Sequence, residues 1–360
     1  MVIALKLSQA RRLDVVAGVS PLAELMACLH VMAEPDHHPE SRGWADKMTS
    51  QLSDSLRTDL FRFAPLWARY RMRLFYPTSR RLGRPIDDEL AELVDMDDDI
   101  FLPLAANAIR GRVVDFRSAE DVLTDRSWVT ECQQRSFNRG ELASSLIADP
   151  RGFRAELASV LRECCTAFFD EEWGRTSARL EASARLVNEN LQDGDLLSIV
   201  ESLSKMASTR GSETTVFFDK LQSASGSVDE NGLLLVPSLR GWPHVMVKMD
   251  RGLPIVIHYL AQEGFAEGAA QSQDEIRRRL LTLAEPGRWE LCRHLIGESI
   301  TTTELAVRTK LSEPAVSRHL RVMREAGLIS SQRDGRQVFH RLHPSLILHL
   351  GQDVLSAIIR

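Results

Sequence analysis

The sequence predicts a mostly α-helical protein with small antiparallel sheets, an α+β fold divided between a large N-terminal domain and a smaller C-terminal one. Three observations lead to this prediction. Apolar residues recur at three- and four-residue steps over much of the chain, as on helices with one buried face. Short apolar runs bounded by prolines and glycines follow near residue 233. Close to the C-terminus, an Asp-Gly pair separates two strand-like runs, the pattern of a β-hairpin.

Length and composition limit the possible classes of protein. The chain has 360 residues, enough for about two domains. It is 44% hydrophobic and can bury a sizeable core, yet no apolar run approaches the ~18 residues of a membrane helix, nor does a secretion signal open the chain. We therefore expect a cytoplasmic protein with no membrane contact. The five cysteines are scattered, without a C-x-x-C pair, which favours buried thiols over disulfides.

The predicted N-terminal elements begin with a strand at residues 2–7, a short alternating apolar run. Ser20 and Pro21 then open a helix over residues 22–32, because proline is tolerated in the first helical turn. Helical patterning resumes over residues 44–76, whose leucine and aromatic stripe is typical of a buried core.

The longest helical stretch covers residues 155–192, and Gly174 is expected to break or kink it. Three apolar runs follow, separated by prolines and glycines: Leu233–Val236, Val245–Val247 and Ile255–Ile257. Their length and spacing predict antiparallel strands. The first domain is therefore expected to be mostly helical with a small sheet.

Two polar groups in this domain allow a functional interpretation. His37 and His38 could indicate a metal site, but two neighbouring histidines without a third ligand are more typical of a solvated loop. Arg80, Arg81 and Arg84 make a basic connection that we interpret as another solvated loop, with contact to nucleic acid as the alternative.

Residues 301–342 predict two short helices followed by a hairpin. The first helix is expected to begin at Thr302 or Thr303, whose hydroxyls can accept hydrogen bonds from first-turn amides. Ser312 is the expected N-cap of the second helix, which ends before Gly327. Two helices, a turn and a hairpin around the Asp-Gly pair make a winged helix-turn-helix.

This stretch is basic, whereas the chain is acidic. Residues 308–341 hold eight basic and three acidic side chains, a net +5, although the whole chain is −5. A basic region on an acidic protein is the electrostatic pattern of a module that contacts phosphates.

The sequence of the second helix carries a specific resemblance. In order along the chain, the matching residues are Leu311, Ser312, Val316, Ser317, His319, Leu320, Arg324, Ala326, Gly327 and Leu328. With these residues, the region 286–342 resembles the DNA-binding domain of the ArsR/SmtB transcriptional regulators. Met323 stands where the family usually has leucine, a change that conserves volume.

The resemblance implies a homodimer that binds double-stranded DNA. We expect base edges to be read by Ser317 and Arg318, with Glu313 and Arg321 as weaker candidates. The residues expected at phosphates or in the wing are Thr302, Thr303, Lys310, Ser312, Arg324, Arg333 and Arg336. The apolar stripe expected at the dimer interface is Ile347, Leu350, Val354, Leu355 and Ile358. The alternative for this stripe is packing on the N-terminal domain, and His319 could serve either DNA contact or packing.

The metal sensors of this family are a poorer match. Their cysteine-containing metal box lies in the first helix of the motif, and here that helix reads TTTELAVRT. His343, His349 and Asp353 only partly match the family's second metal site, and their spacing is poor. We therefore predict no metal and no cofactor, with a zinc- or metal-sensing repressor as an alternative.

A second resemblance covers the N-terminal part. The segments SPLAELMACLHVMAEPDHHP and DENGLLLVPSLRGWPHVMV resemble an uncharacterised domain that precedes the winged helix in one subgroup of these regulators. We expect a domain at residues 1–262 that senses a signal, a linker at 263–274, and a domain at 275–360 that binds DNA and dimerises.

These observations predict a sequence-specific DNA-binding transcriptional regulator, a repressor that is not an enzyme. We expect a small ligand or a partner protein to act on the N-terminal domain, which is larger than dimerisation requires. An enzyme domain fused to a DNA-binding module is the alternative, although the chain has no G-x-S-x-G, Walker or H-E-x-x-H motif. A winged helix used only for protein contacts is a third possibility, against which the basic charge argues.

Overall fold

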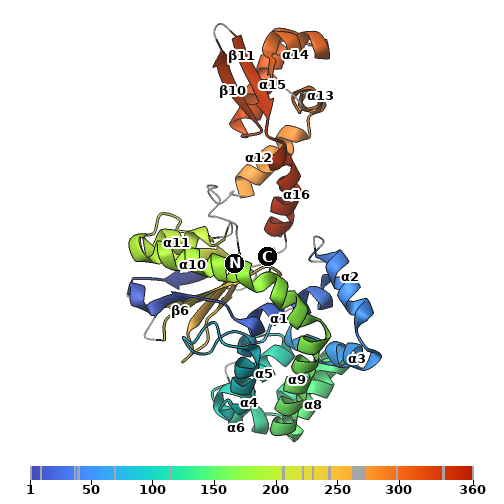
Figure 1. Cartoon of the computed structure of the whole chain (residues 1–360), viewed down its shortest axis with the longest axis vertical. Helices are drawn as coiled ribbons and strands as arrows, with labels where there is room; N and C mark the ends of the chain where they lie inside the picture. Colours follow the sequence, from blue (N-terminus) through green and yellow to red (C-terminus); the bar gives the residue numbers. More distant parts are fainter. Residues whose placement is uncertain are drawn as a thin grey trace. The chain divides into compact units, whose positions relative to one another are not determined.

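The computed structural model describes residues 2–358 apart from 9, 36–37, 39–40, 69, 113–115, 205–206, 221–222, 229–230, 242–244, 262–272, 297–298 and 335–336. The chain divides into two compact units, Met1–Ala266 and Glu267–Arg360. Both units combine helices with small sheets, which confirms the predicted mostly helical α+β class (Figure 1). Most of the predicted linker, residues 263–272, lies outside the described residues.

The first unit holds two four-stranded sheets. The first has the order β3 (Ala207–Ser208), β4 (Thr215–Asp219), β1 (Val2–Lys6) and β5 (Ala224–Ser227). The second has the order β2 (Val15–Ala17), β6 (Leu233–Ser238), β8 (Ile255–Leu260) and β7 (Met246–Lys248). The predicted strands at residues 2–7 and in the three apolar runs are thus confirmed.

The antiparallel arrangement predicted for these three runs is wrong in part. β6 is parallel to both β2 and β8, and only β7 runs antiparallel to β8. All six residues of β6 are buried. An unbroken apolar run of this kind is typical of a parallel strand with both faces covered. It is a better indicator of strand direction here than the short connections between the three runs.

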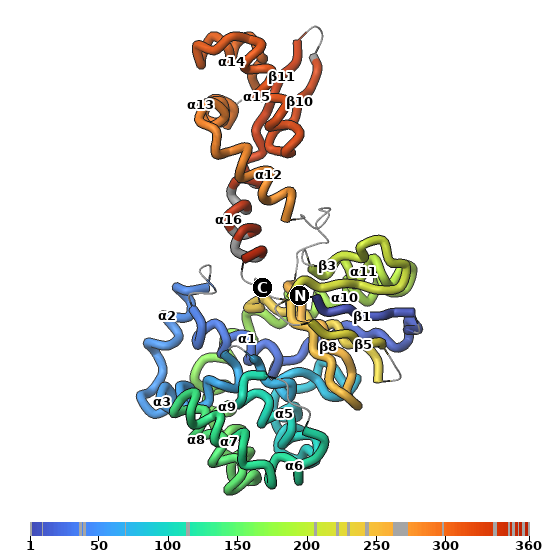
Figure 2. Tube along the Cα trace, turned by 180° about the vertical axis from the view of Figure 1, so that it is seen from behind, coloured from blue at the N-terminus to red at the C-terminus, as the bar shows by residue number. Residues whose placement is uncertain are grey.

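Eleven α-helices of the first unit surround these sheets in the described residues. They are α1 (Pro21–Ala33), α2 (Arg42–Gln51), α3 (Asp54–Phe63), α4 (Ile86–Asp95), α5 (Asp98–Arg110), α6 (Ala119–Thr124), α7 (Ser127–Arg135), α8 (Phe137–Ala148), α9 (Pro150–Cys164), α10 (Asp170–Asp193) and α11 (Leu196–Ser202). Figure 2 shows the labelled parts of α10 and α11 near β1 and β3, while helices such as α3, α5, α8 and α9 gather in another part of the unit.

Each face of the second sheet packs on a different core. Leu234 and Val236 belong to the helical core of α1 to α9, whereas Leu233 and Leu235 belong to a core shared with α10 and α11. Alternate side chains of a strand point to opposite faces, so β6 joins the two cores. This position explains why β6 is buried throughout.

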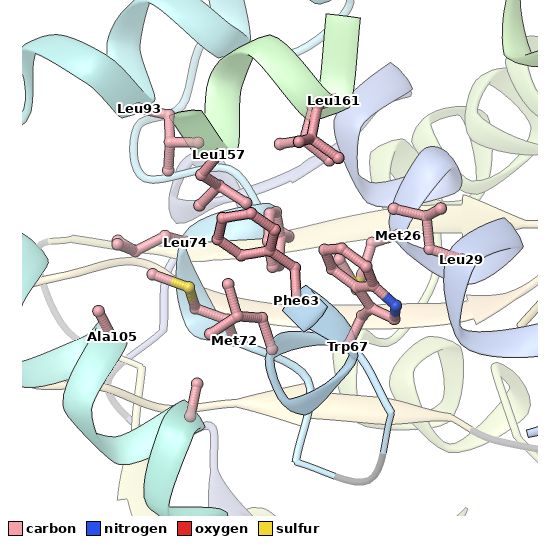
Figure 3. Close-up of a cluster of buried hydrophobic side chains, with 14 of the residues drawn as sticks. Met26, Leu29, Phe63, Trp67, Met72, Leu74, Leu93, Ala105, Leu157 and Leu161 are labelled. Atoms are coloured by element: carbon pink, nitrogen blue, oxygen red, sulfur yellow. The ribbon is translucent and has the colours of Figure 1, made fainter. Parts of the chain in front are cut away.

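The helical core is built around aromatic side chains (Figure 3). Phe63 and Trp67 lie with Leu157, Leu161 and Met26 among the buried side chains of this cluster. The ring centroids of Phe63 and Phe153 are 5.7 Å apart at an interplanar angle of 66°, an edge-to-face arrangement that stabilises beyond the area buried. The predicted core role of the aromatic stripe is confirmed.

The start of α1 follows the prediction. Ser20 is the N-cap, its hydroxyl accepts from the Ala23 amide at 3.2 Å, and Pro21 lies in the first turn. The helical patterning predicted over residues 44–76 is confirmed for α2 and α3, but it ends earlier than expected, because α3 ends at Phe63 and a short 3₁₀ turn follows at Ala64–Leu66. Pro65 lies in that turn and has no N–H to continue the α-helical hydrogen bonds.

The kink predicted at Gly174 is also misplaced. Gly174 lies within α10, and the irregularity is a π-helical turn at Cys165–Phe169, between α9 and α10. The turn shifts the buried face, so that neighbours such as Cys164 and Cys165 are both buried in the helical core. Both thiols are free and serve as packing groups, as predicted.

The second unit forms the predicted winged helix-turn-helix. Its elements are α12 (Gln273–Leu283), α13 (Pro286–Leu295), β9 (Ile300–Thr301), α14 (Thr302–Thr309), α15 (Glu313–Glu325), β10 (Ile329–Asp334), β11 (Gln337–Leu342) and α16 (Pro344–Ile358). β10 and β11 pair antiparallel as the predicted hairpin, and β9 pairs with β11. Figure 1 shows α14, α15 and this hairpin together in one unit.

Candidate nucleic-acid interface

The first helix of the motif, α14, is capped one residue earlier than predicted. The Thr301 hydroxyl accepts from the Glu304 amide at 3.3 Å, so Thr301 is the N-cap in place of Thr302 or Thr303. Thr301 has the extended backbone that an N-cap requires, with a φ of −82° and a ψ of 159°. Lys310 then turns the chain with a φ of +57°, a left-handed conformation unusual for lysine.

The second helix, α15, has one buried face. Val316, Leu320 and Met323 are buried against α13 and α14, at the helical spacing that the sequence indicates. Ser312 is the N-cap residue, as predicted, although its side chain makes no capping hydrogen bond. Gly327 ends the helix with a φ of +73°.

The opposite face of α15 is exposed and basic. The exposed residues include all the predicted base-reading candidates, Glu313, Ser317, Arg318 and Arg321, together with Arg324. Arg321 lies 3.8 Å from Glu325, an exposed pair one turn further along α15. Among the described residues, Arg318, Arg324 and Lys310 form no ion pair. Their cations are therefore available to an anionic partner.

His319 belongs to the packing of the module. Its Nδ1 lies 3.6 Å from Oε2 of Glu285, the N-cap of α13, and its side chain is only 24% exposed. The Glu285 carboxylate also accepts from the Arg288 amide at 2.9 Å. This contact joins α15 to the first turn of α13, which favours packing over DNA contact for His319.

His340 is a structural residue that the sequence prediction missed. From β11 it contacts the Thr302 hydroxyl through Nε2 at 3.0 Å and the Ser331 hydroxyl through Nδ1 at 2.9 Å. It thereby ties the start of α14 to both strands of the wing. The Thr302 hydroxyl, predicted to bind phosphate, is occupied by this contact, whereas Thr303 is exposed. His340 alternates with buried Leu342 on β11, but no local pattern in the sequence marks its two hydroxyl partners.

The pH dependence of this contact can be predicted. Burial, followed by the charge of Arg324, lowers the pKa of His340 below its ordinary value of 6.5. A lowered pKa means that His340 binds its proton more tightly in the unfolded chain than in the folded one. Its contribution to the free energy of unfolding is therefore fully present above about pH 6.5 and is lost as the pH falls. We expect the stability difference between the wild type and His340→Gln to shrink between about pH 8 and pH 5, measured by urea unfolding. A constant difference would contradict this.

The wing and the terminal helix hold the remaining predicted residues. Arg333 is exposed on β10, and Arg336 lies outside the described residues. On α16, Leu350 is 6% exposed and Ile358 is 70% exposed, while Ile347 and Val354 are half-buried. The side chain of Leu355 is outside the described part. Because α16 packs on α12 of the same chain, part of the predicted dimer stripe is already buried.

Two further observations concern the described part of the chain. No group of three His, Cys, Asp or Glu side chains is arranged there to hold a metal ion, and His37 and His349 are outside it. No helix among the described residues is long and apolar enough to cross a membrane.

The fold and the exposed face of α15 define the second unit as a winged helix-turn-helix module. Residues 285–331 match the bacterial regulatory protein, arsR family, which confirms the resemblance seen in the sequence. Residues 1–264 match a family of unknown function, DUF5937, and the chain belongs to this family.

Curated relatives share only the smaller part of the chain. The arsenic resistance transcriptional regulator ArsR1 of Pseudomonas putida is 39% identical over 74 residues, 20% of this chain and 49% of that protein. The biofilm growth-associated repressor of Agrobacterium fabrum is 35% identical over 68 residues, 19% of this chain and 58% of that protein. An ArsR-like transcriptional regulator from Rhodococcus sp. RHA1, a solved structure, is 25% identical over 24% of this chain and 79% of that chain, with a TM-score of 0.22. The chain thus spans about half the length of these curated relatives.

Proposed function

We propose that this protein is a homodimeric, sequence-specific DNA-binding transcriptional repressor whose first unit receives the controlling signal. The observation that carries the proposal is α15, which buries one apolar face and exposes Ser317, Arg318 and Arg324 on the other. A helix of this kind fits the major groove of DNA. The match of residues 285–331 to the arsR family supports the same function.

In this proposal, one set of residues contacts the DNA bases and another set contacts the DNA phosphates. Arg318 can donate two hydrogen bonds to guanine O6 and N7, with Ser317 beside it and Glu313 and Arg321 on the same exposed face. The phosphate contacts come from side chains around this face and in the wing, which are Thr303, Lys310, Ser312, Arg324, Arg333 and Arg336. Thr302 can add its backbone amide, since its hydroxyl contacts His340.

The protein's own selection of DNA tests this function. Full-length protein is incubated with a pool of random duplexes, and the bound DNA is amplified and sequenced over several rounds. We expect enrichment of an inverted repeat whose half-sites lie about one helical turn, roughly 10 base pairs, apart. A pool that stays random after selection would reject the proposal.

Dimerisation should involve the exposed end of α16. Ile358 is 70% exposed there, and a two-fold pairing of terminal helices would bury it. We expect Ile358→Asp to shift the protein from dimer to monomer in sedimentation velocity, because a buried unpaired carboxylate is strongly unfavourable. The control is Phe137→Asp on α8, a residue 79% exposed, which should leave the dimer intact. Equal sedimentation of the two variants would contradict the assignment.

Control by the first unit requires only differential affinity. A ligand or partner protein that binds the DNA-incompetent conformation more tightly than the DNA-bound one lifts repression by that difference. The first unit is large, with two cores and two sheets, and the described residues of the winged helix have a separate core of their own. This supports its role as the receiver of the signal.

A further inference from the structure

Buried cations gather on one face of the second sheet of the first unit. In the β7–β8 pair, Lys248 lies opposite Val256, and Met246 lies opposite His258. Side chains directly opposite or two residues apart share a face of a sheet. Lys248 and His258 therefore lie on the same face as Val256, which packs in the helical core.

The segment that follows α3 brings further polar groups to this face. The Lys248 Nζ donates to the carbonyl oxygens of Tyr70 at 3.1 Å and Arg71 at 2.5 Å. It also lies 4.9 Å from the ring centroid of Tyr70 and 5.7 Å from that of Tyr76. This ammonium group is thus enclosed by carbonyls and aromatic rings.

Arg73 is a buried cation held by three backbone carbonyls and one carboxylate. Its guanidinium donates to the carbonyls of Tyr76 at 3.0 Å, Pro77 at 3.1 Å and Pro254 at 2.9 Å. Its Nε lies 3.4 Å from the Asp250 carboxylate. Arg73 therefore holds the segment on the sheet and uses the nearest carboxylate.

Arg71 is less well compensated. It is 3% exposed, and its backbone has a φ of +49°, a strained conformation for a residue with a side chain. Its guanidinium lies beside the Tyr76 hydroxyl and forms no ion pair within the described part of the chain. Strained, buried residues of this kind are often found at ligand sites.

Lys220 and His258 complete the group. Lys220, directly after β4, is half-buried, donates to the Val245 carbonyl and lies close enough to Arg71 for the two positive charges to repel. His258 is 2% exposed, with its ring centroid 5.4 Å from that of Tyr76. Among the described residues, its Nε2 has no hydrogen-bond partner. A buried nitrogen without a partner is unfavourable unless a ligand or water satisfies it.

Positive charge therefore exceeds negative charge in this cluster of Arg71, Arg73, Lys220, Lys248 and His258. Asp250 pairs with Arg73 and also lies close enough to Lys248 to favour its charged form, and Asp219 lies close to Lys220. Burial is the main cause that lowers the pKa of both Lys220 and Lys248 to about 7. It lowers the pKa of His258 to about 3, which keeps that imidazole neutral. A bound anion would offset this repulsion and stabilise the charged lysines.

We propose that this cationic cluster binds a small anionic group, a carboxylate or a phosphate, between Arg71, Lys220 and Lys248, with Nε2 of His258 as an additional donor. Tyr76 also lines a neighbouring cleft, whose other lining residues, such as Arg81 and Arg84, lie outside the cluster. The inference rests on the proposed function in one respect, since it assigns the anionic group to the effector that the first unit receives.

The test is an anion titration of the full-length protein. Its thermal unfolding midpoint is followed against inorganic phosphate and, separately, against acetate, with chloride added to keep the ionic strength constant. We expect a saturable rise with one or both anions, and which anion binds more tightly distinguishes phosphate from carboxylate. Arg71→Gly, which suits the positive φ, and Lys220→Gln, which is half-buried, should each weaken the affinity at least tenfold.

Two comparisons make the titration decisive. Lys310→Gln, in the winged helix, should leave the response unchanged, which separates the cluster from phosphate binding by the DNA-binding unit. A response that is absent, not saturable, or equal in the wild type and Lys220→Gln would overturn the inference. If the wild-type protein binds no DNA, the proposed function is rejected, whereas the result of the anion titration remains valid.

Discussion

Replacing Arg318 with alanine is expected to weaken binding to the selected DNA roughly 10- to 100-fold and to flatten the base preference at one position of each half-site. Arg318 is exposed on α15 and forms no ion pair in the described part of the chain, so the alanine removes a free guanidinium and little folded-state packing. The measurement is a binding titration with the selected duplex and with duplexes changed at single positions.

Arg324→Ala is the matched control for this variant. Arg324 is also exposed on α15, one turn and a half further along, where we assign it to phosphate. It should weaken binding to all duplexes alike and reduce the salt dependence by about one counterion. If Arg318→Ala keeps the wild-type base preference, the base-reading assignment fails.

Phe63→Ala is expected to destabilise the first unit by about 3–5 kcal/mol. Phe63 is completely buried, and its ring packs against Phe153 and Trp67 in the helical core. The alanine removes a large apolar side chain and leaves a cavity that the surrounding side chains fill only in part. Urea unfolding followed by tryptophan fluorescence measures the loss, since Trp67 and Trp128 are buried in the same core.

Phe61 provides the control on the same helix. It lies two residues before Phe63 on α3, and its side chain is 70% exposed. Phe61→Ala should change the unfolding free energy by no more than about 0.5 kcal/mol. Similar losses for the two variants would mean that the core around Phe63 is wrongly described.

The second unit could be predicted from sequence because its determinants are local. Val316, Leu320 and Met323 mark the buried face of α15 by spacing alone, and the Asp-Gly pair marks the hairpin. His340 and the capping role of Thr301 were missed. Both depend on which partner the folded chain brings within hydrogen-bonding distance, and local patterns do not contain that information.

The first unit was predicted less well because its determinants are distant in sequence. β6 and β8 are neighbours in the sheet although β7 lies between them in the sequence, and no turn motif indicates whether such a pair is parallel or antiparallel. Arg71 and Arg73 alternate with apolar residues in a segment that could as well have been exposed. Their burial depends on distant strands, since the Arg71 carbonyl accepts from Lys248 and Arg73 donates to the Pro254 carbonyl.

The central claim, that the exposed basic face of α15 and the wing bind DNA phosphates, is tested most directly by the salt dependence of binding. The dissociation constant of the full-length protein for its selected duplex is measured at several salt concentrations between about 50 mM and 200 mM. Release of counterions from several phosphates predicts a linear fall of log affinity with log salt, with a loss of at least tenfold over this range. An affinity that does not change with salt, or no binding at the lowest salt concentration, would contradict the account.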